Sequence, residues 1–386
     1  SYVRIISPEM NGSDWSGLAE SAASPDHPFS IVHIGDSHLQ ADIATNITRQ
    51  MLQYDFGNAG RGLISPLRLS GTNEPLNYSF RSDITWQAER FMKPQWEIMG
   101  FTGCAISSDS PQGYIELSTS DRDDWNPFNS ITIYHSGILS VDSVSDSEGN
   151  GIGYVISENS NSTTICLDRN ERLVRIAITD SGPLTIFGAY LVSGHPGLVY
   201  NVIGNNGATF RSYNRIPSFG NDLSTLRPDI VVVSLGCNEA FGRFNEFDFQ
   251  LQIDNLVRSI RQANPGTRIL LTTPMECHRR TSVGRSRRGG KRRRRMTGFA
   301  VNPNVEPVRN AILRYGRKNG IPVYDFYAAA GGKGASDLWV ADGLYSKDHI
   351  HLSGDGYRLM GRLFYRAIID AMTQTEQRTT TPQLKK

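Results

Sequence analysis

A hydroxyl, a carboxylate and an imidazole stand near opposite ends of this sequence in the order Ser, Asp, His. Ser37 closes the run 29–37, and Asp348 precedes His351 by three residues. A hydroxyl is a poor nucleophile at neutral pH unless a base removes its proton and a carboxylate orients that base. These residue types therefore predict attack by Ser37 on a carbonyl, provided that the fold brings the two ends of the chain together.

The Ser37 segment has the pattern of a strand, a tight turn and a helix. Residues 29–34 are mostly apolar and β-branched, Gly35 allows a sharp turn, and an apolar stripe of helical period follows Ala41. Free backbone N–H groups at a helix start can stabilise an oxyanion. A turn with a capping serine shows the same pattern, so this segment alone leaves both interpretations open. The stripe consists of Ile43, Ile47, Met51, Leu52 and Phe56.

Two further strand ends carry groups that suit an oxyanion site. Asn238 follows the apolar run 229–235 in a Gly-x-Asn pattern, and its amide can donate to a developing negative charge. Gly204 ends the run 199–204, where a glycine lets its backbone N–H approach a substrate closely. Each fits an ordinary strand-to-helix loop when taken alone. Together they predict an oxyanion hole around one serine, at the carboxyl ends of neighbouring strands.

The elements that must position these groups alternate along the chain. Strands are expected at 268–272 and 321–326, and amphipathic helices at 247–263 and 304–319. The last helix is expected to follow Ser353, which suits an N-cap. Strands that alternate with helices predict a doubly wound parallel sheet with its site at the strand carboxyl ends.

With these residues in place, the chain resembles the SGNH (GDSL-like) hydrolases. Gly-Asp-Ser at Ser37, Gly204, Gly-x-Asn at Asn238 and the Asp348/His351 pair match the four ordered blocks of that family. The resemblance implies an α/β fold of three α/β/α layers and ester hydrolysis. It implies Ser37 as nucleophile, His351 as base and Asp348 as its orienting partner. The oxyanion hole would comprise the Ser37 and Gly204 N–H groups and the Asn238 side chain.

Two features separate this sequence from related patterns. The third block of the family commonly ends in Asp, and here Glu239 stands in that place; because Asn238 is retained, we still expect activity. A Gly-x-Ser-x-Gly elbow is missing from the sequence, which argues against the α/β-hydrolase fold despite the shared order of triad residues.

Other histidines compete for the base role. His349 follows Asp348 directly and, in an extended segment, would face away from it, so the spacing favours His351. His33 and His38 lie close to Ser37 in sequence and are expected to be structural or supporting. A metal site is not expected, because no second segment has a zinc-type spacing, and the reaction needs no cofactor.

Residues 75–195 break the alternation of strands and helices. Short strand-like runs such as 113–117 and 173–178 are separated by Gly, Ser, Asn and Asp clusters. This pattern predicts an inserted all-β sandwich or jelly roll. Residues 1–74 and 196–386 would then form a discontinuous hydrolase domain.

The insert contains Trp86, Trp96 and Trp125. Aromatic faces stack on sugar rings, so carbohydrate binding is one interpretation, and packed core tryptophans are the other. An SGNH domain interrupted in this way resembles the bacterial O-acetylpeptidoglycan esterases, whose insert looks like a family-35 carbohydrate-binding module. The glycine-rich stretch 56–62 adds to that likeness.

The segment Arg279–Arg295 is strongly basic. Ten of its seventeen residues are Lys or Arg and none is acidic, so without those ten charges the formal net charge falls from +2 to −8. One interpretation is a basic loop within the hydrolase domain that contacts an anionic polymer; a solvated loop is the other. Nucleic acid is a less favoured partner for it.

Composition bounds the remaining choices. With 386 residues the chain is long enough for two domains, and no apolar run approaches the roughly 20 residues that span a bilayer. The chain begins at Ser1, which we interpret as a mature periplasmic or secreted protein with its signal peptide removed. In an oxidising compartment Cys104 and Cys166 can pair, whereas Cys237 is expected to be a small packed residue.

The function expected from the sequence is a serine esterase that removes O-acetyl groups from a bacterial cell-wall glycan, such as O-acetylated peptidoglycan, through an acetyl-enzyme on Ser37. An O-acetyltransferase and an acetylxylan-type carbohydrate esterase use the same residues. A glycan-binding or polyanion-binding protein without activity is the non-enzyme alternative.

Overall fold

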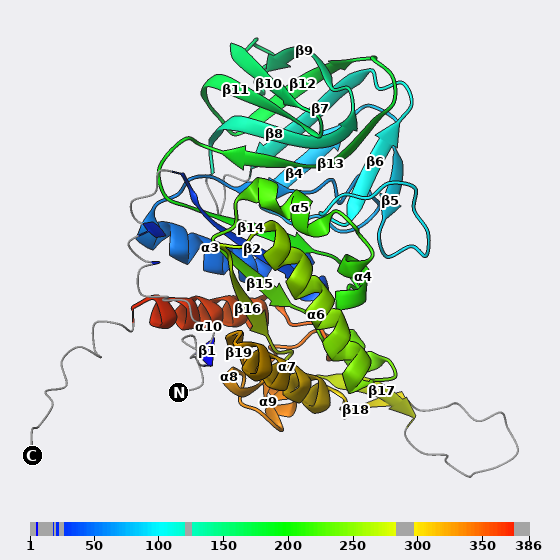
Figure 1. The fold of residues 1–386 in the computed structure, drawn as a ribbon, viewed down its shortest axis with the longest axis vertical. Coiled ribbons are helices and arrows are strands. Elements are labelled where there is room, and N and C mark those ends of the chain that lie inside the picture. Colours follow the sequence, from blue (N-terminus) through cyan, green and yellow to red (C-terminus); the bar gives the residue numbers. More distant parts are fainter. Residues whose placement is uncertain are drawn as a thin grey trace, which may run out of the picture.

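The computed structural model shows an α/β region and an antiparallel β region that lies beyond one edge of its sheet (Figure 1). Both regions are described almost throughout. The described residues are 5–6, 18, 21–22, 27–119, 126–282 and 297–373.

A six-stranded sheet forms the centre of the α/β region, in the order β1-β19-β16-β15-β2-β14. All neighbours pair in parallel except β1, which is antiparallel to β19. In chain order the parallel strands stand 2-1-3-4-5, the doubly wound order whose switch point lies between the first and third strands, here β2 and β15. The strands are β1 (Ile5–Ile6), β2 (Phe29–Gly35), β14 (Leu198–Gly204), β15 (Ile230–Ser234), β16 (Arg268–Thr272) and β19 (Val323–Tyr324).

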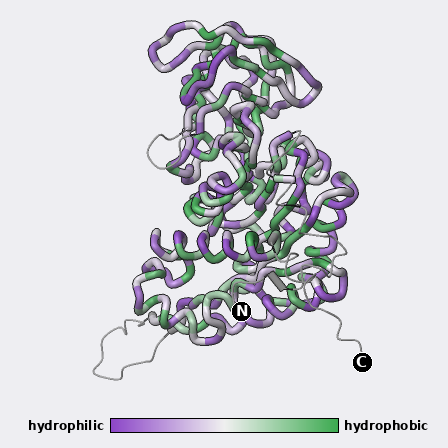
Figure 2. Tube along the Cα trace, turned by 90° about the vertical axis from the view of Figure 1, so that its left-hand side faces the viewer, coloured by the Kyte–Doolittle hydropathy of each residue, from purple (hydrophilic) through white to green (hydrophobic). Residues whose placement is uncertain are grey.

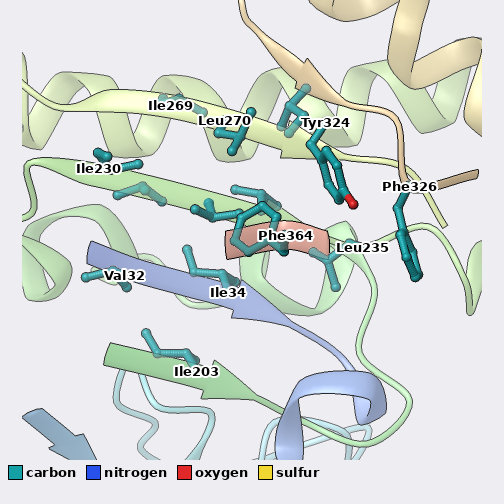
Figure 3. Packing of buried hydrophobic residues seen from close by; sticks show 14 of the residues in the cluster. Val32, Ile34, Ile203, Ile230, Leu235, Ile269, Leu270, Tyr324, Phe326 and Phe364 are labelled. Carbon is teal, nitrogen blue, oxygen red and sulfur yellow. The ribbon is translucent and has the colours of Figure 1, made fainter. Parts of the chain in front are cut away.

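Helices cover both faces of this sheet, which confirms the three-layer α/β/α fold. One layer pairs α3 with α10, and the other contains α6 with α4, α5 and α7, each of which contacts α6. Figure 3 shows apolar side chains of the strands packed under Phe364 of α10. The layers are α3 (Ile43–Phe56) and α10 (Gly354–Thr373), then α4 (Phe210–Asn214), α5 (Phe219–Leu223), α6 (Glu246–Ala263) and α7 (Val305–Asn319).

The expected helices of this region are confirmed to within a residue or two. The helix expected at 247–263 is α6, whose first turn is capped by the Asn245 side chain. The Ser353 hydroxyl accepts a hydrogen bond from the N–H of Gly356 and so caps α10 as expected. The shorter elements are α2 (Ser37–Gln40), α8 (Phe326–Ala329), α9 (Ala335–Ala341), the turns η2 (Ser224–Leu226) and η3 (Glu239–Phe241), and the hairpin β17 (His278–Ser282) and β18 (Thr297–Val301).

The antiparallel region is a sandwich of two sheets. One sheet has the order β10-β11-β8-β13-β6-β5 with β3 added on β13, and the other has the order β4-β7-β12-β9. Its strands are β3 (Gly62–Ile64), β4 (Tyr78–Ser82), β5 (Gln87–Arg90), β6 (Cys104–Ser108), β7 (Gly113–Thr119), β8 (Phe128–Gly137), β9 (Ser140–Ser145), β10 (Tyr154–Asn159), β11 (Ser162–Glu171), β12 (Leu173–Thr179) and β13 (Leu184–Val192).

The two sheets share an apolar core that includes Phe80, Ile133 and Ile176. Buried and partly exposed residues alternate along strands such as β12, as expected when one face of a sheet packs and the other meets water. Figure 2 shows short hydrophobic (green) and hydrophilic (purple) stretches along the upper region. The domain boundaries predicted at 74/75 and 195/196 stay a prediction; β3, from the first of those segments, pairs with β13.

The sequence left a pairing of Cys104 with Cys166 open, and the structure shows that they do not pair. Both thiols are free. Cys104 lies in β6 and Cys166 in β11, and β13 and β8 stand between these strands. Three strand spacings amount to roughly 14 Å, about twice the Cα separation that a disulfide tolerates.

Two of the insert's three tryptophans, Trp86 and Trp96, lie in the described part of the chain, and both pack against other side chains. Trp86 packs against the sandwich core. The guanidinium of Arg215 lies 3.8 Å from the centre of the Trp96 ring and covers its face. Trp125 lies outside the described residues, as do residues 283–296 of the basic segment.

The predicted apolar stripe of α3 is confirmed only in part: Leu52 is fully buried and Ile43 and Phe56 pack against the core, but the buried face is centred on other residues. The fully buried positions of α3 include Thr48, Arg49 and Gln53, whereas Ile47 and Met51 are only partly buried. The buried polar face exists because it joins a network around Asp42, whose carboxylate lies 2.9 Å from Arg49. Helical periodicity alone cannot anticipate this face, because arginine is almost never fully buried unless it is paired.

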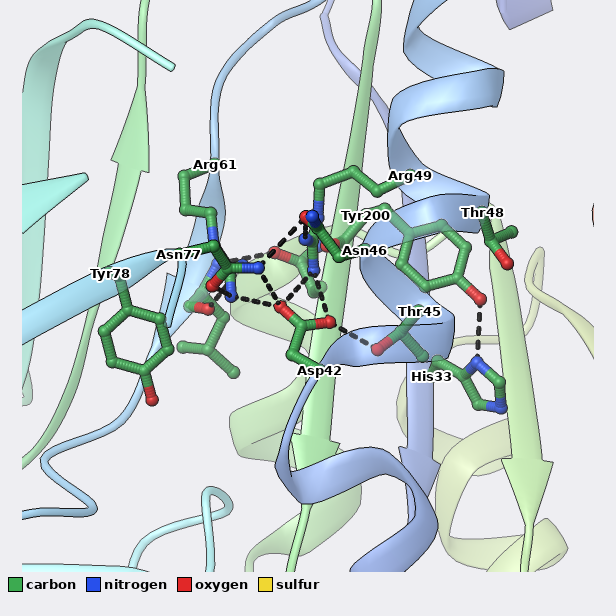
Figure 4. A network of polar contacts seen from close by, with 12 residues as sticks. His33, Asp42, Thr45, Asn46, Thr48, Arg49, Arg61, Asn77, Tyr78 and Tyr200 are labelled. Atoms are coloured by element: carbon green, nitrogen blue, oxygen red, sulfur yellow. Dashed lines mark hydrogen bonds and ion pairs between the residues drawn. The ribbon is translucent and has the colours of Figure 1, made fainter. Parts of the chain in front are cut away.

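The Asp42 network ties the two regions together (Figure 4). The guanidinium of Arg61, just before β3, lies 2.6 Å from the Asp42 carboxylate, and the Asn77 amide, just before β4, donates to it at 2.8 Å. Burial raises the pKa of Asp42, but Arg49 and Arg61 outweigh that effect and bring the pKa below its ordinary value. The carboxylate is therefore ionised and anchors both chain segments that enter the sandwich.

Candidate active site

Ser37, His351 and Asp348 form a continuous set of contacts. Ser37 is the first residue of α2, directly beyond the carboxyl end of β2. Its Oγ lies 2.8 Å from Nε2 of His351, and Nδ1 of His351 lies 2.6 Å from Oδ2 of Asp348. The imidazole and carboxylate side chains are 40% and 38% exposed, so a substrate can reach the set from solvent.

The segment that carries the base is closed on itself by short-range hydrogen bonds. Oδ1 of Asp348 accepts the backbone N–H groups of Ile350 and His351, each at 3.0 Å. The N–H of Ser346 donates to the carbonyl of His351 at 2.8 Å. The Asp348 carboxylate thus binds both the backbone N–H and the ring of His351. Both contacts fix the orientation of the imidazole.

The protonation of this pair follows from the same contacts. Burial raises the pKa of Asp348, but the hydrogen bonds from the His351 ring and from two backbone N–H groups outweigh it. Its pKa therefore lies below the ordinary value, and the carboxylate is ionised near neutral pH. An ionised Asp348 places a proton on Nδ1 of His351 and leaves Nε2 free to accept the proton of Ser37.

Gly204 and Asn238 end the two strands that flank β2. Gly204 lies in register with Gly35 at the ends of β14 and β2. A Cβ at Gly204 would come within 2.5 Å of the backbone nitrogen of Gln40, so a glycine is required for α2 to pack here. Asn238 follows β15, on the other side of β2.

The Asn238 amide is oriented by two acceptors. Its Nδ2 donates to the carbonyl of Ala208 at 2.9 Å and to Oδ2 of Asp36 at 3.3 Å. Asp36 is the N-cap of α2, and its other oxygen accepts the N–H of His38 at 3.0 Å. The contact to Asp36 is the longer of the two.

The structure places His351, and not His349, against Ser37. His349 has a φ of 57°, which turns its side chain away, and its ring stacks on Phe299 with 4.1 Å between ring centres. His38 lies behind the site: its ring centre is 5.4 Å from that of His351, and its Nδ1 is 3.2 Å from the hydroxyl of Tyr357.

His33 is a buried residue of β2 and lies away from the site. Its ring nitrogens contact the hydroxyls of Tyr200 and Ser234 at 2.7 and 2.6 Å. Burial lowers the pKa of His33 to about 3, so the ring stays neutral at physiological pH. The sequence interpretation of a structural histidine matches these contacts.

Glu239, where the family pattern commonly has Asp, faces the protein interior beside Asn238. Its Oε1 accepts the N–H of Phe210 at 2.9 Å, and its Oε2 is shielded from solvent without a hydrogen-bond partner among the described residues. Burial raises the pKa of Glu239 to about 7. The side chain therefore supports the start of α4 rather than pointing to the substrate.

Sequence reasoning missed the polar residues that surround the nucleophile. Gln40, at the end of α2, accepts the N–H of Asn206 at 2.6 Å and donates to Thr72 at 2.9 Å. Asp36 stands in the Gly-Asp-Ser motif itself, so its contact with Asn238 had a signal in the sequence. The partners of Gln40 had none, because Thr72 lies far from it along the chain.

The described part of the chain has neither a candidate metal cluster nor a helix suited to a bilayer. There, no group of three or more His, Cys, Asp or Glu side chains is arranged to hold a metal ion. No helix within the described residues has the length and apolar character needed to cross a bilayer.

Comparison with known families gives one match. A family model described as GDSL-like Lipase/Acylhydrolase matches residues 177–359. That range contains Gly204, Asn238, Asp348 and His351, and Ser37 precedes it. Among curated proteins no sequence matches.

Comparison with solved structures finds one that shares the fold of this chain. A peptidoglycan O-acetylesterase structure is 22% identical and aligns over 95% of this chain and 98% of that one, with a TM-score of 0.74. A lipase/acylhydrolase from Enterococcus faecalis is 18% identical over 45% of this chain and 76% of that one, with a TM-score of 0.31. A family two carbohydrate esterase from Cellvibrio japonicus is 10% identical over 76% and 98%, with a TM-score of 0.32. Of these three, the first alone has a TM-score that supports a common fold.

Proposed function

We propose that this chain is a GDSL-type carboxylic ester hydrolase that removes O-acetyl groups from a bacterial cell-wall glycan, with O-acetylated peptidoglycan as the substrate. The observation that carries the proposal is the continuous path of contacts from Ser37 through His351 to Asp348. The choice of substrate is supported by the likeness of fold to a peptidoglycan O-acetylesterase over 95% of this chain.

In the first half of the reaction, Ser37 attacks the acetyl carbonyl. Nε2 of His351, 2.8 Å from the hydroxyl, takes the proton as the oxygen–carbon bond forms. The ionised Asp348 stabilises the imidazolium that results and keeps the ring in place. His351 then gives its proton to the departing sugar oxygen, which leaves an acetyl group on Ser37.

The tetrahedral intermediate carries its negative charge on the former carbonyl oxygen. We assign its donors as the Ser37 N–H, the Gly204 N–H and the Asn238 amide, which end or follow β2, β14 and β15. The hydrogen bond from Asn238 to the Ala208 carbonyl at 2.9 Å keeps the amide in place. The second amide proton leaves Asp36 and donates to the oxyanion instead.

Water completes the reaction by the same route. His351 removes a proton from water, which attacks the acetyl-enzyme and releases acetate. If a second sugar hydroxyl took the place of water, the same residues would perform O-acetyl transfer. The partial exposure of His351 gives water access to the acetyl-enzyme and favours hydrolysis.

The decisive experiment measures acetate released from O-acetylated peptidoglycan and from acetylated xylan. We expect release from peptidoglycan, and its loss in Ser37→Ala with an unchanged far-UV circular dichroism spectrum. Acetate from xylan alone would replace the proposed substrate by an acetylxylan. Acetylated acceptor in place of free acetate would make the enzyme a transferase.

This substrate implies where the enzyme works and how its parts serve it. We propose a periplasmic or secreted enzyme, because peptidoglycan lies outside the cytoplasm. We also propose that residues 75–195 form an inserted domain of carbohydrate-binding-module type. The basic segment 279–295 is a proposed contact with an anionic polymer.

A further inference from the structure

A groove of about 520 Å³ runs along the segment between β3 and β4, outside the triad. Its walls include Arg68, Thr72, Asn73, Leu76 and Ser79. This volume lies within the range of sites that bind small ligands, and it exceeds what an acetyl group needs. The groove can therefore hold part of the molecule to which the ester is attached.

Hydrogen bonds join this groove to the nucleophile segment. Gln40, three residues after Ser37 in α2, donates to Thr72 at 2.9 Å and to Oδ1 of Asn73 at 2.7 Å. Asn206, two residues after Gly204, donates to the same oxygen of Asn73 at 2.8 Å. The groove thus begins at the side of the site where Gly204 lies.

The segment that forms the groove is held at both ends, so the groove is preformed. At one end, the N–H groups of Ser70 and Thr72 donate hydrogen bonds to the carbonyls of Pro66 and Leu67 and close a tight turn around Arg68. At the other end, Asn77 is fixed by the buried Asp42 network of Figure 4. A preformed groove loses little conformational entropy when a ligand binds.

The groove carries one uncompensated positive charge. The Arg81 guanidinium is neutralised by Glu74 at 2.6 Å. The Arg68 side chain is exposed, and its guanidinium has no hydrogen bond or ion pair with another described residue. An arginine held on a fixed turn presents a planar donor that suits a carboxylate.

The remaining surface of the groove suits a sugar. Leu76 is 95% exposed and offers an apolar side chain to the C–H face of a ring. The Asn73 Nδ2 and the Ser79 hydroxyl belong to side chains that line the groove, and they can form hydrogen bonds with sugar hydroxyls. A positive group, an apolar side chain and polar groups in one groove fit a carbohydrate that bears a carboxylate.

We propose that this groove binds the polymer part of the substrate, an anionic glycan whose carboxylate pairs with Arg68 while its acetyl ester reaches Ser37. This inference rests on the proposed function and deepens it. It selects carboxylate-bearing glycans, such as peptidoglycan with its peptide carboxylates, over neutral acetylated glycans such as xylan.

The test compares Arg68→Gln with Arg317→Gln. Arg317 is an exposed arginine of α7, and its side chain, like that of Arg68, has no partner among the described residues. We expect Arg68→Gln to raise the KM for O-acetylated peptidoglycan about fivefold, and Arg317→Gln to leave it unchanged. In Arg68→Gln, kcat/KM should therefore fall on peptidoglycan relative to kcat/KM on a chromogenic acetate ester. Arg68→Lys restores part of the loss.

A binding measurement separates this inference from the proposed function. In the Ser37→Ala background, sedimentation with insoluble peptidoglycan reports binding without turnover. We expect Arg68→Gln to weaken this binding and to make it less sensitive to salt than binding by the parent. That result would support glycan binding in the groove even if the wild type releases no acetate from peptidoglycan. Binding and KM that are unchanged by Arg68→Gln, or an equal loss on acetylated xylan, overturn it.

Discussion

The α/β region and the sandwich bury their strands in different ways, and one of them alone gathers reactive groups. β2 is buried along all seven of its residues, whereas buried and partly exposed positions alternate in β12. Helices cover both faces of a parallel sheet, while each sheet of a sandwich keeps one face toward water. Parallel strands also end at one edge, so the residues after β2, β14 and β15 meet there. Antiparallel strands end at alternate edges and gather no such set.

This difference predicts that substitutions at the strand ends of the α/β region change rates, and that substitutions in the sandwich core change stability. The largest effect is expected for Asp348→Asn. An amide cannot keep the proton on Nδ1 of His351, so kcat for a chromogenic acetate ester should fall on the order of 10³-fold to 10⁴-fold. Stopped-flow or steady-state absorbance measures it.

Asp337→Asn is the matched control for that experiment. Asp337 lies 2.9 Å from His278, which gives a second aspartate–histidine pair outside the triad. We expect kcat of the Asp337→Asn variant to stay at the wild-type value. A comparable fall in both variants would mean that the rate depends on general charge and not on the tautomer of His351.

Asn238→Ala should have the next largest effect. Loss of one oxyanion donor commonly costs about 10²-fold to 10³-fold in kcat, and KM should change little because the contact forms in the transition state. Kinetics on the same ester, with the melting temperature as a check on folding, measure this split. An unchanged kcat would show that the amide serves to hold Ala208 and Asp36 alone.

The pair Ile133→Ala and Ile34→Ala compares the two cores directly. Both side chains are fully buried, Ile133 in β8 of the sandwich and Ile34 in β2 next to the site. Each truncation should lower the free energy of unfolding by about 2–5 kcal/mol in urea titrations. Below the transition, Ile133→Ala should keep its kcat on the small ester and Ile34→Ala should lose part of it. A loss of kcat in Ile133→Ala would contradict the division of roles.

The smallest effect concerns pH. Burial raises the pKa of Glu239 from 4.5 to about 7, so the folded protein holds a proton that the unfolded chain releases in that window. The stabilising contribution is complete below pH 4.5 and is lost as the pH rises through 7. Glu239→Gln removes this term, so its melting temperature should fall less than that of the wild type between pH 5 and pH 8. Equal falls would assign the pH dependence to other groups.

The candidate site was more accessible to sequence reasoning than its surroundings. Ser37, Gly204 and Asn238 each follow an apolar run, and the parallel topology that those runs predict brings their ends to one edge. The contact between Ser37 and His351 needs no further information than that topology and the Asp-x-x-His spacing. The assignment of catalytic roles to these residues stays a prediction for the kinetics above.

The remaining features depend on contacts between distant segments. Arg61 and Asn77 meet Asp42 from 19 and 35 residues away, and neither has a local pattern that marks it as buried. For the same reason the buried face of α3 and the cover of Arg215 over Trp96 could not be predicted. Periodicity describes how a helix meets an apolar core, and it is silent about a core that contains an ion pair.

The separation of Ser37 from its base has a consequence for biosynthesis. The two residues are 314 positions apart, with the whole sandwich between them. Chains emerge from the ribosome at about 5–20 residues per second, amino terminus first, so a growing polypeptide carries the hydroxyl for tens of seconds before it carries the imidazole. During that interval the nascent chain has no means to cleave an ester, and hydrolytic competence arrives in a single step near the end of translation of the α/β region.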